Sequence, residues 1–232
     1  MYKVCIFDLD GTLADTLVSI AYNANRALEA FGLQTHPIQK YRYFAGDGAD
    51  ELIRRSLRES GDENLEHYTQ VREIYREFFR KDCLYQVKPF DGMVETLKII
   101  KKQGVKIAVL SNKPHENSIK VVETLFGEGF FDYIQGQQEG IPRKPSPVGA
   151  LHIAEIFGVQ PYECLYFGDT NTDMHTGKSA GMKTVGVTWG FREKKELEES
   201  GADLLVDHPS EIAELIKLEC DMGGKHDSSD SK

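Results

Sequence analysis

The stretch from Val4 to Leu13 places the strongest constraint on how this chain can fold. Its apolar run VCIF ends at Asp8, and Asp10 and Gly11 follow after one leucine. A short apolar run bounded by a glycine is typical of a buried strand in a parallel sheet. Such sheets bind ligands beyond the carboxyl ends of their strands, so two acids at this point favour a chemical role. An ordinary exit turn also uses Asp and Gly, and this stretch alone leaves the two interpretations level.

The pattern after the first strand divides the chain into a helical segment and an alternating segment. Residues 15–84 carry apolar side chains at helical spacing, which predicts a small helical bundle. Helix and strand patterns alternate over residues 85–220, as in a parallel sheet flanked by helices. The first strand needs partners for its backbone, so we expect it to pair centrally with the later strands.

The predicted fold is therefore α/β, with a Rossmann-like parallel sheet core and an inserted α-helical cap. The core comprises residues 1–14 and 85–220, and the cap comprises residues 15–84. Residues 221–232 combine glycines, serines and charges without apolar periodicity, and are predicted to be disordered.

Composition limits the partners of this chain. The 28 basic residues against 37 acidic ones give a net charge of −9, which argues against sequence-independent binding to nucleic acid or anionic membranes. The N-terminus lacks a signal-peptide pattern and no apolar stretch is long enough to span a membrane, so we expect a cytoplasmic protein. The scattered cysteines and histidines predict neither a disulfide framework nor a zinc site. The sequence indicates no oligomeric state.

Further polar groups follow the predicted strands or precede a predicted helix. They are Ser111-Asn112-Lys113 after residues 105–110, Lys144 in the proline-flanked loop 141–147, and Asp169 with Asp173 after residues 164–167. Because parallel strands end at one edge of a sheet, these groups can converge with the two acids of the first strand. Each group has a simpler interpretation: a turn, a solvated lysine, or acids that cap a helix. Together, those alternatives require several coincidences at one edge.

These groups resemble, in order and context, the four motifs of the haloacid dehalogenase-like phosphatase superfamily. The motifs are Asp8-Leu9-Asp10-Gly11-Thr12-Leu13, Ser111-Asn112-Lys113, Lys144-Pro145, and Gly168-Asp169 with Asp173. The resemblance covers almost the whole chain, including the helical cap, and residues 187–192 and 169–181 look more particularly like the phosphoglycolate phosphatase branch. It implies a phosphomonoester hydrolase that acts on a small phosphorylated metabolite, with phosphoglycolate the first to test.

The chemistry of the first motif agrees with that implication. Asp8 can attack phosphorus and form an aspartyl phosphate, which divides one difficult hydrolysis into two easier steps. Asp10 can protonate the leaving oxygen and later take a proton from water. Gly11 allows the backbone to turn close to the phosphate, and we expect Thr12 to fix Asp10 by a hydrogen bond.

The other motifs complete a phosphate and metal site. Ser111 and the Asn112 amide can hold phosphate oxygens, while Lys144 supplies positive charge. The resemblance implies a Mg²⁺ ion bound by the Asp8 and Asp169 side chains and the Asp10 main-chain carbonyl. Asp173 would ligate through water or orient Lys144. Mg²⁺ suits the site because it prefers oxygen ligands and can separate two anions that would repel each other.

Other functions and other residues remain as alternatives. A sugar-phosphate mutase or an inorganic pyrophosphatase would share these motifs. A dehalogenase is disfavoured because it has no use for the acid at Asp10, and a non-catalytic binding protein because every expected acid and Lys144 are present. The loop 46–48 is expected to face the active site. Two further sets either contact substrate or serve ordinary surface and packing roles: Arg42, Arg54, Arg55 and Arg58, and Trp189 with Arg192.

Overall fold

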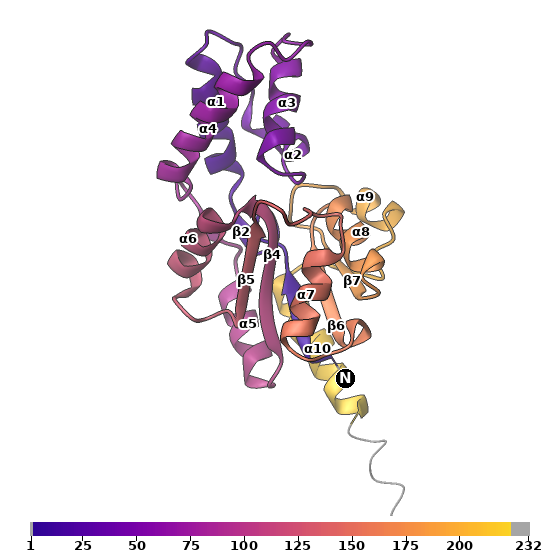
Figure 1. Cartoon of the computed structure of the whole chain (residues 1–232). Coiled ribbons are helices and arrows are strands. Elements are labelled where there is room, and N and C mark those ends of the chain that lie inside the picture. Colours follow the sequence, from indigo (N-terminus) through magenta and orange to yellow (C-terminus); the bar gives the residue numbers. More distant parts are fainter. Residues whose placement is uncertain (1, 224–232) are drawn as a thin grey trace, which may run out of the picture.

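A six-stranded parallel sheet forms the centre of the computed structural model, which describes residues 2–223 (Figure 1). Its strands are β1 (Val4–Phe7), β4 (Lys106–Pro114), β5 (Tyr133–Gln137), β6 (Cys164–Gly168), β7 (Lys183–Val187) and β8 (Leu204–Val206), in the order β5-β4-β1-β6-β7-β8. Strand β1 pairs in parallel with β4 on one side and β6 on the other. The central position predicted for the first strand is confirmed.

Both faces of this sheet are covered, which explains the uninterrupted apolar run of β1. Val4 and Ile6 pack with residues of α7 (Val148–Ile156) on one face. Cys5 and Phe7 pack on the other face with residues of α5 (Met93–Lys102) and α10 (Pro209–Gly223). Successive side chains of a strand point to opposite faces, so every position of β1 must be apolar. The remaining helices of this part are α6 (His115–Phe126), η2 (Pro161–Glu163), α8 (Asn171–Ser179) and α9 (Lys194–Glu199).

A helical cap stands at the carboxyl end of the sheet, drawn in indigo and purple in Figure 1. It consists of α1 (Leu17–Glu29), η1 (Ile38–Lys40), α2 (Tyr41–Phe44), α3 (Ala49–Glu59) and α4 (Tyr68–Asp82). The buried side chains of α4 are Val71, Tyr75 and Phe79, at the spacing of one helix face. The predicted helical cap is confirmed, whereas its bounds at residues 15 and 84 stay a prediction.

Two strands that the sequence did not reveal connect the cap to the sheet. β2 (Ala14–Asp15) and β3 (Lys88–Pro89) pair antiparallel where the chain leaves the core and returns to it. Strands of two residues are too short to show an alternating pattern. The segment that leads from the core into the cap therefore lies beside the segment that leads back.

Two predicted boundaries were wrong. β4 does not end at Leu110 but runs to Pro114, with a register shift between these residues against β5. The extension was not predicted because residues 111–114 are not apolar, and a buried strand is predicted from its apolar residues. Helix α10 continues to Gly223, so residues 221–223 are helical where we expected disorder. Helix ends are hard to place because the last turn needs no apolar side chain. Residues 224–232 lie outside the described residues.

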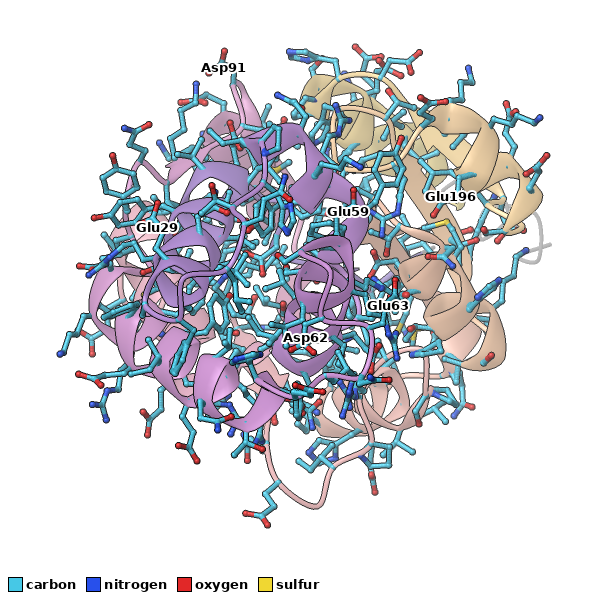
Figure 2. All side chains as sticks on the ribbon, turned by 90° about the horizontal axis from the view of Figure 1, so that it is seen from above. Glu29, Glu59, Asp62, Glu63, Asp91 and Glu196 are labelled. Carbon is cyan, nitrogen blue, oxygen red and sulfur yellow. The ribbon has the colours of Figure 1, made fainter. Side chains whose placement is uncertain are left out.

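Acidic residues lie over the outer surface of the cap when it is viewed from above (Figure 2). Glu29, Glu59 and Glu63 are exposed on the cap, and Asp91 is exposed beside it. Solvated carboxylates keep their hydration, so their charge costs the fold little free energy. Carboxylates buried at the sheet edge lose that hydration. Within residues 2–223, no helix combines the length and apolar character needed to cross a membrane.

Candidate active site

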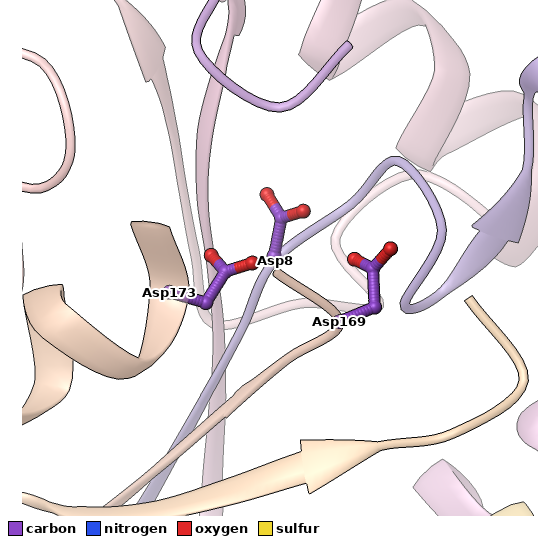
Figure 3. Close-up of side chains that lie close together, drawn as sticks. All are labelled: Asp8, Asp169 and Asp173. Atoms are coloured by element: carbon purple, nitrogen blue, oxygen red, sulfur yellow. The ribbon is translucent and has the colours of Figure 1, made fainter. Parts of the chain in front are cut away.

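Three buried carboxylates meet at the carboxyl edge of the sheet (Figure 3). Asp8 follows β1, Asp169 follows β6, and Asp173 lies in the first turn of α8. One carboxylate oxygen from each lies within 4.8 Å of the others, and the side chains of Asp8 and Asp169 point the same way in Figure 3. The structure thus brings together acids that are distant in the sequence because β1 and β6 are adjacent parallel strands.

Lys144 joins this cluster as a buried cation. Its Nζ donates to Asp8 Oδ1 at 2.6 Å and to Asp173 Oδ1 at 2.7 Å. The loop that carries it is held by Asn112, whose side-chain oxygen accepts from the Lys144 N–H at 2.9 Å and whose side-chain nitrogen donates to the Lys144 carbonyl at 3.1 Å. The Asn112 side chain therefore positions the lysine, while Asn112 and Ser111 both line the adjacent pocket.

Asp173 serves the helix and the site with different oxygens. Its Oδ2 accepts from the Thr170 N–H at 3.2 Å and from the Thr170 hydroxyl at 2.7 Å, which closes a capping box at the start of α8. Its Oδ1 accepts from Lys144. From the sequence, helix capping and a role in the site are alternatives for Asp173, and the structure contains both contacts.

Asp169 lies in a close-fitting cradle made by residues from both ends of the chain. Its Oδ1 accepts from the Thr12 hydroxyl at 2.9 Å, and its Oδ2 accepts from the Phe191 N–H at 2.7 Å. A Cβ placed on Gly11 would lie 2.3 Å from Asp169 Oδ2, and one placed on Gly190 would lie 2.2 Å from Asp169 Cβ. Only glycine fits at either position, and Gly11 also has a positive φ of 89°.

The expectation that Thr12 fixes Asp10 was wrong. The amides of Thr12, Leu13 and Ala14 all donate to the Leu9 carbonyl, so the chain folds back tightly after β1. That turn directs Thr12 toward Asp169. Thr12 is fully buried, and it contributes to the site by holding this acid.

Asp10 is held by Lys113, whose role in the site was not predicted from the sequence. Lys113 Nζ lies 2.7 Å from Asp10 Oδ1 and 3.0 Å from Asp10 Oδ2. The available signal was its position two residues after Ser111, because alternate residues of a strand share a face. The apolar pattern ends at Leu110, so Lys113 lies outside the strand that the sequence predicts.

Burial and mutual repulsion raise the pKa values of the buried acids. Burial raises the pKa of Asp8 to about 7; Lys144 opposes this, while Asp173 and Asp10 add to it. Burial, with Asp173 and Asp8, raises the pKa of Asp169 well above its ordinary value. Burial opposes a charge on Lys144, but Asp173 and Asp8 raise its pKa well above the ordinary range. The cluster therefore lacks positive charge when all its acids are ionised.

The donor atoms of this cluster fit a divalent cation. They are carboxylate oxygens, which hard cations such as Mg²⁺ and Ca²⁺ prefer to nitrogen or sulfur. A divalent cation would supply the missing charge between Asp8 and Asp169. Asp169 also accepts hydrogen bonds from the Thr12 hydroxyl and the Phe191 N–H. Hydrogen bonds of this kind orient metal ligands in proteins.

A pocket opens between this edge and the cap. It is lined from the core by Asp8, Asp10, Ser111, Asn112, Lys113 and Pro114, and from the cap by Ile20, Ala45, Gly46, Gly48, Ala49, Leu52, Tyr75 and Phe79. The floor is polar and the cap side is largely apolar. The pocket can hold a small ligand whose charged group faces the polar floor and whose remainder faces the cap.

The loop 46–48 faces the pocket, as expected, and is bound to the core. The Asn112 side chain donates to the Gly46 carbonyl at 3.1 Å, and Thr172 donates to Asp47 Oδ1 at 2.6 Å. Arg42 donates to the carbonyls of Gly190 and Phe191 at 2.6 and 2.9 Å. Among the described residues that line the pocket, the four cap arginines considered above are not found, nor are Trp189 and Arg192. Arg192 instead donates to the Ala45 carbonyl at 2.9 Å and thus contacts the cap.

Comparisons with known proteins agree with this geometry. The family model for haloacid dehalogenase-like hydrolases matches residues 5–187. A phosphoglycolate phosphatase of Aquifex aeolicus is 33% identical over 214 residues, covering 92% of this chain and 96% of the relative. The solved structure of a candidate phosphoglycolate phosphatase from Lactobacillus delbrueckii subsp. bulgaricus has a TM-score of 0.86 and 31% identity, covering 93% of this chain and 98% of that one. A candidate β-phosphoglucomutase from Thermotoga maritima has a TM-score of 0.69 and 26% identity, covering 93% and 99%.

Proposed function

Because this chain belongs to the haloacid dehalogenase-like hydrolase family and is a phosphatase of it, we propose that it hydrolyses phosphoglycolate with Mg²⁺ through an aspartyl phosphate. The substrate is suggested by the phosphoglycolate phosphatases it resembles. One observation supports the mechanism above all: Asp8 lies in a buried cluster with Asp169 and Asp173. In this cluster Asp8 Oδ1 is 2.6 Å from Lys144 Nζ.

Asp8 is the nucleophile in this proposal. One of its oxygens forms a bond to phosphorus while the bond from phosphorus to the leaving oxygen breaks. The leaving oxygen takes the proton of the Asp10 carboxyl group and departs as the alcohol of glycolate. Lys144 holds positive charge next to Asp8 and the transferred group, where negative charge accumulates.

Asp10 then acts in the opposite direction. It takes a proton from a water molecule that attacks the phosphorus of the aspartyl phosphate, the bond to Asp8 breaks, and inorganic phosphate leaves. Ser111 and Asn112 line the pocket beside Asp8. The Ser111 hydroxyl and the main-chain amide of Asn112 hold phosphate oxygens through both steps.

The side chains of Asp8 and Asp169 and the main-chain carbonyl of Asp10 would hold Mg²⁺, with Asp173 acting by orienting Lys144. When bound, the ion neutralises charge between the carboxylate and the phosphate. The Thr12 hydroxyl and the Phe191 N–H keep Asp169 turned toward the site.

Replacement of the nucleophile tests this proposal. Asp8→Asn should lower phosphate release from phosphoglycolate to background while the far-ultraviolet circular dichroism and cooperative unfolding persist. Lys178→Met, which removes a surface ion pair with Asp203, is a control for the effect of a substitution far from the site and should retain full activity. Mg²⁺-dependent turnover by Asp8→Asn at the wild-type rate would contradict the assignment.

A sugar-phosphate mutase is the second candidate, favoured by the similarity to the Thermotoga maritima protein. The higher TM-score of the Lactobacillus protein supports hydrolysis instead. Incubation with a sugar phosphate separates the two, since a mutase forms an isomer without releasing phosphate. An inorganic pyrophosphatase stays a third prediction, tested by adding pyrophosphate to the same assay.

A further inference from the structure

Lys113 is a buried cation that the proposed mechanism does not use. Its side chain is 2% exposed, and its Nζ lies 4.6 Å from the ring centre of Phe79. An ammonium group loses hydration when it is buried, and a paired carboxylate and an aromatic face only partly replace it. A buried lysine beside the proposed catalytic acid therefore calls for a role in the site.

The ammonium group belongs to the pocket that would receive the alcohol part of the ester. Phe79, Tyr75 and Leu52 line the cap side of this pocket, and Lys113 lines the core side. Among the described residues that line it, Lys113 is the one lysine or arginine. Lys144 contacts Asp8 and Asp173 instead. An alcohol with a single negative charge would find its counter-charge at Lys113.

The distance between Lys113 and the reacting atoms matches a short substrate. The ammonium is 2.7 and 3.0 Å from the two oxygens of Asp10. Asp10 must itself come within hydrogen-bond distance, roughly 3 Å, of the leaving oxygen to protonate it. Lys113 therefore lies within about two hydrogen-bond lengths of that oxygen. A carboxylate on the carbon attached to the leaving oxygen can span this gap.

The same ion pair restrains Asp10. Both carboxylate oxygens of Asp10 accept from one ammonium group, so Asp10 cannot turn toward a leaving oxygen without giving up part of that contact. A carboxylate on the substrate offers Lys113 an equivalent acceptor. Exchange of one carboxylate for the other keeps the buried ammonium paired at every stage.

We propose that Lys113 binds the carboxylate of the substrate's alcohol part and thereby releases Asp10 toward the leaving oxygen. The inference rests on the proposed phosphatase function and adds a specificity rule to it. The preferred substrates are phosphate esters whose alcohol carries a carboxylate next to the ester carbon. Neutral esters of the same size leave Asp10 held by Lys113 and react slowly.

Two esters that differ in one group test the rule: phosphoglycolate, and ethyl phosphate, which has a methyl group in place of the carboxylate. The wild type should prefer phosphoglycolate by at least about 100-fold in kcat/KM. Lys113→Met should lower kcat/KM for phosphoglycolate by about 100-fold or more and lower that for ethyl phosphate by a much smaller factor, so that the preference for phosphoglycolate is largely lost. Lys178→Met should keep both values and their ratio.

A purely structural role of Lys113 gives a different result. If the lysine only positions Asp10, Lys113→Met slows both esters by the same factor, and the inference is overturned while the phosphatase assignment stands. A wild type that releases no phosphate from any ester overturns both. Product inhibition provides a test that needs no variant: glycolate should inhibit ethyl phosphate hydrolysis by the wild type, and ethanol at the same concentration should not. Equal effects of glycolate and ethanol would contradict a carboxylate site.

Discussion

The hydroxyl of Thr12 donates a 2.9 Å hydrogen bond to Asp169, although 157 positions of sequence separate the two residues. The bond is buried, and it holds one oxygen of the acid while the Phe191 N–H holds the other. The orientation of a proposed metal ligand thus depends on the turn after β1 and on the loop after β7. Neither segment carries that ligand itself.

Thr12→Val should weaken metal binding while the protein stays folded. Valine has a similar shape but leaves Asp169 Oδ1 without its donor, so we expect a loss of about 1–3 kcal/mol in the free energy of unfolding. The Mg²⁺ concentration for half-maximal phosphate release should rise about 10- to 100-fold. Urea denaturation and a Mg²⁺ titration measure the two effects. Thr124→Val, which removes a hydroxyl bond within α6, is the control, and an unchanged Mg²⁺ requirement in Thr12→Val would count against the cradle.

Gly190→Ala should strongly lower activity by displacing Asp169. The added Cβ would lie 2.2 Å from Asp169 Cβ and 2.5 Å from its Cγ, and the Gly190 carbonyl is held by a hydrogen bond from Arg42. We expect kcat/KM to fall at least about 100-fold, since a displacement of a site group by about 1 Å can cost that much. Gly104→Ala is the comparison, because nothing lies within 4 Å of its added Cβ. That variant should lose about 1 kcal/mol of stability through its positive φ and keep its activity. Full activity in Gly190→Ala would show that the cradle can widen.

The metal-free protein should lose stability as pH rises, and Mg²⁺ should restore it. Folding raises the pKa of Asp8 from its ordinary value of 3.8 to about 7, mainly through burial. The folded state therefore retains this proton to higher pH than the unfolded state, and the stability present at low pH is lost as pH rises through this window. In the proposed site Mg²⁺ would bind the ionised carboxylate, so its stabilising effect should be larger at about pH 8 than at about pH 5.

Thermal unfolding with chelator and with Mg²⁺ at these two pH values measures the effect. Asp8→Asn is the control, because it lacks the titrating group: without metal, its melting temperature relative to the wild type should rise between about pH 5 and about pH 8. A difference between variant and wild type that does not change with pH would contradict the buried, proton-retaining Asp8.

Much of the site could be predicted because it lies at the ends of parallel strands. Asp8 and Asp169 follow apolar runs that are visible in the sequence, and adjacent parallel strands deliver their ends to one edge. Lys144 could be predicted because it lies in a proline-flanked loop that directly precedes a helix. The structure brings these residues together with Asp173, as expected, while their individual roles stay proposals.

The partners of Thr12, Asp10 and Asp169 could not be predicted in the same way. Thr12 points to Asp169 because a tight turn reverses the chain after β1, and turns of this kind leave no periodic pattern. Lys113 reaches Asp10 because β4 extends past its apolar part. Gly190 is required by a contact that exists only after β7 has packed beside β6.

The sequence by itself determined the α/β class, the inserted helical cap and the residues that gather at the sheet edge, because these depend on apolar periodicity and on the position of strand ends. Only the tertiary structure decided which side chain each acid contacts. Hydrogen bonds and ion pairs depend on distances of about 3 Å, and such distances are set by turns, register and packing rather than by spacing along the chain. The pairing of Lys113 with Asp10, and the substrate preference proposed from it, belong to this second kind of information.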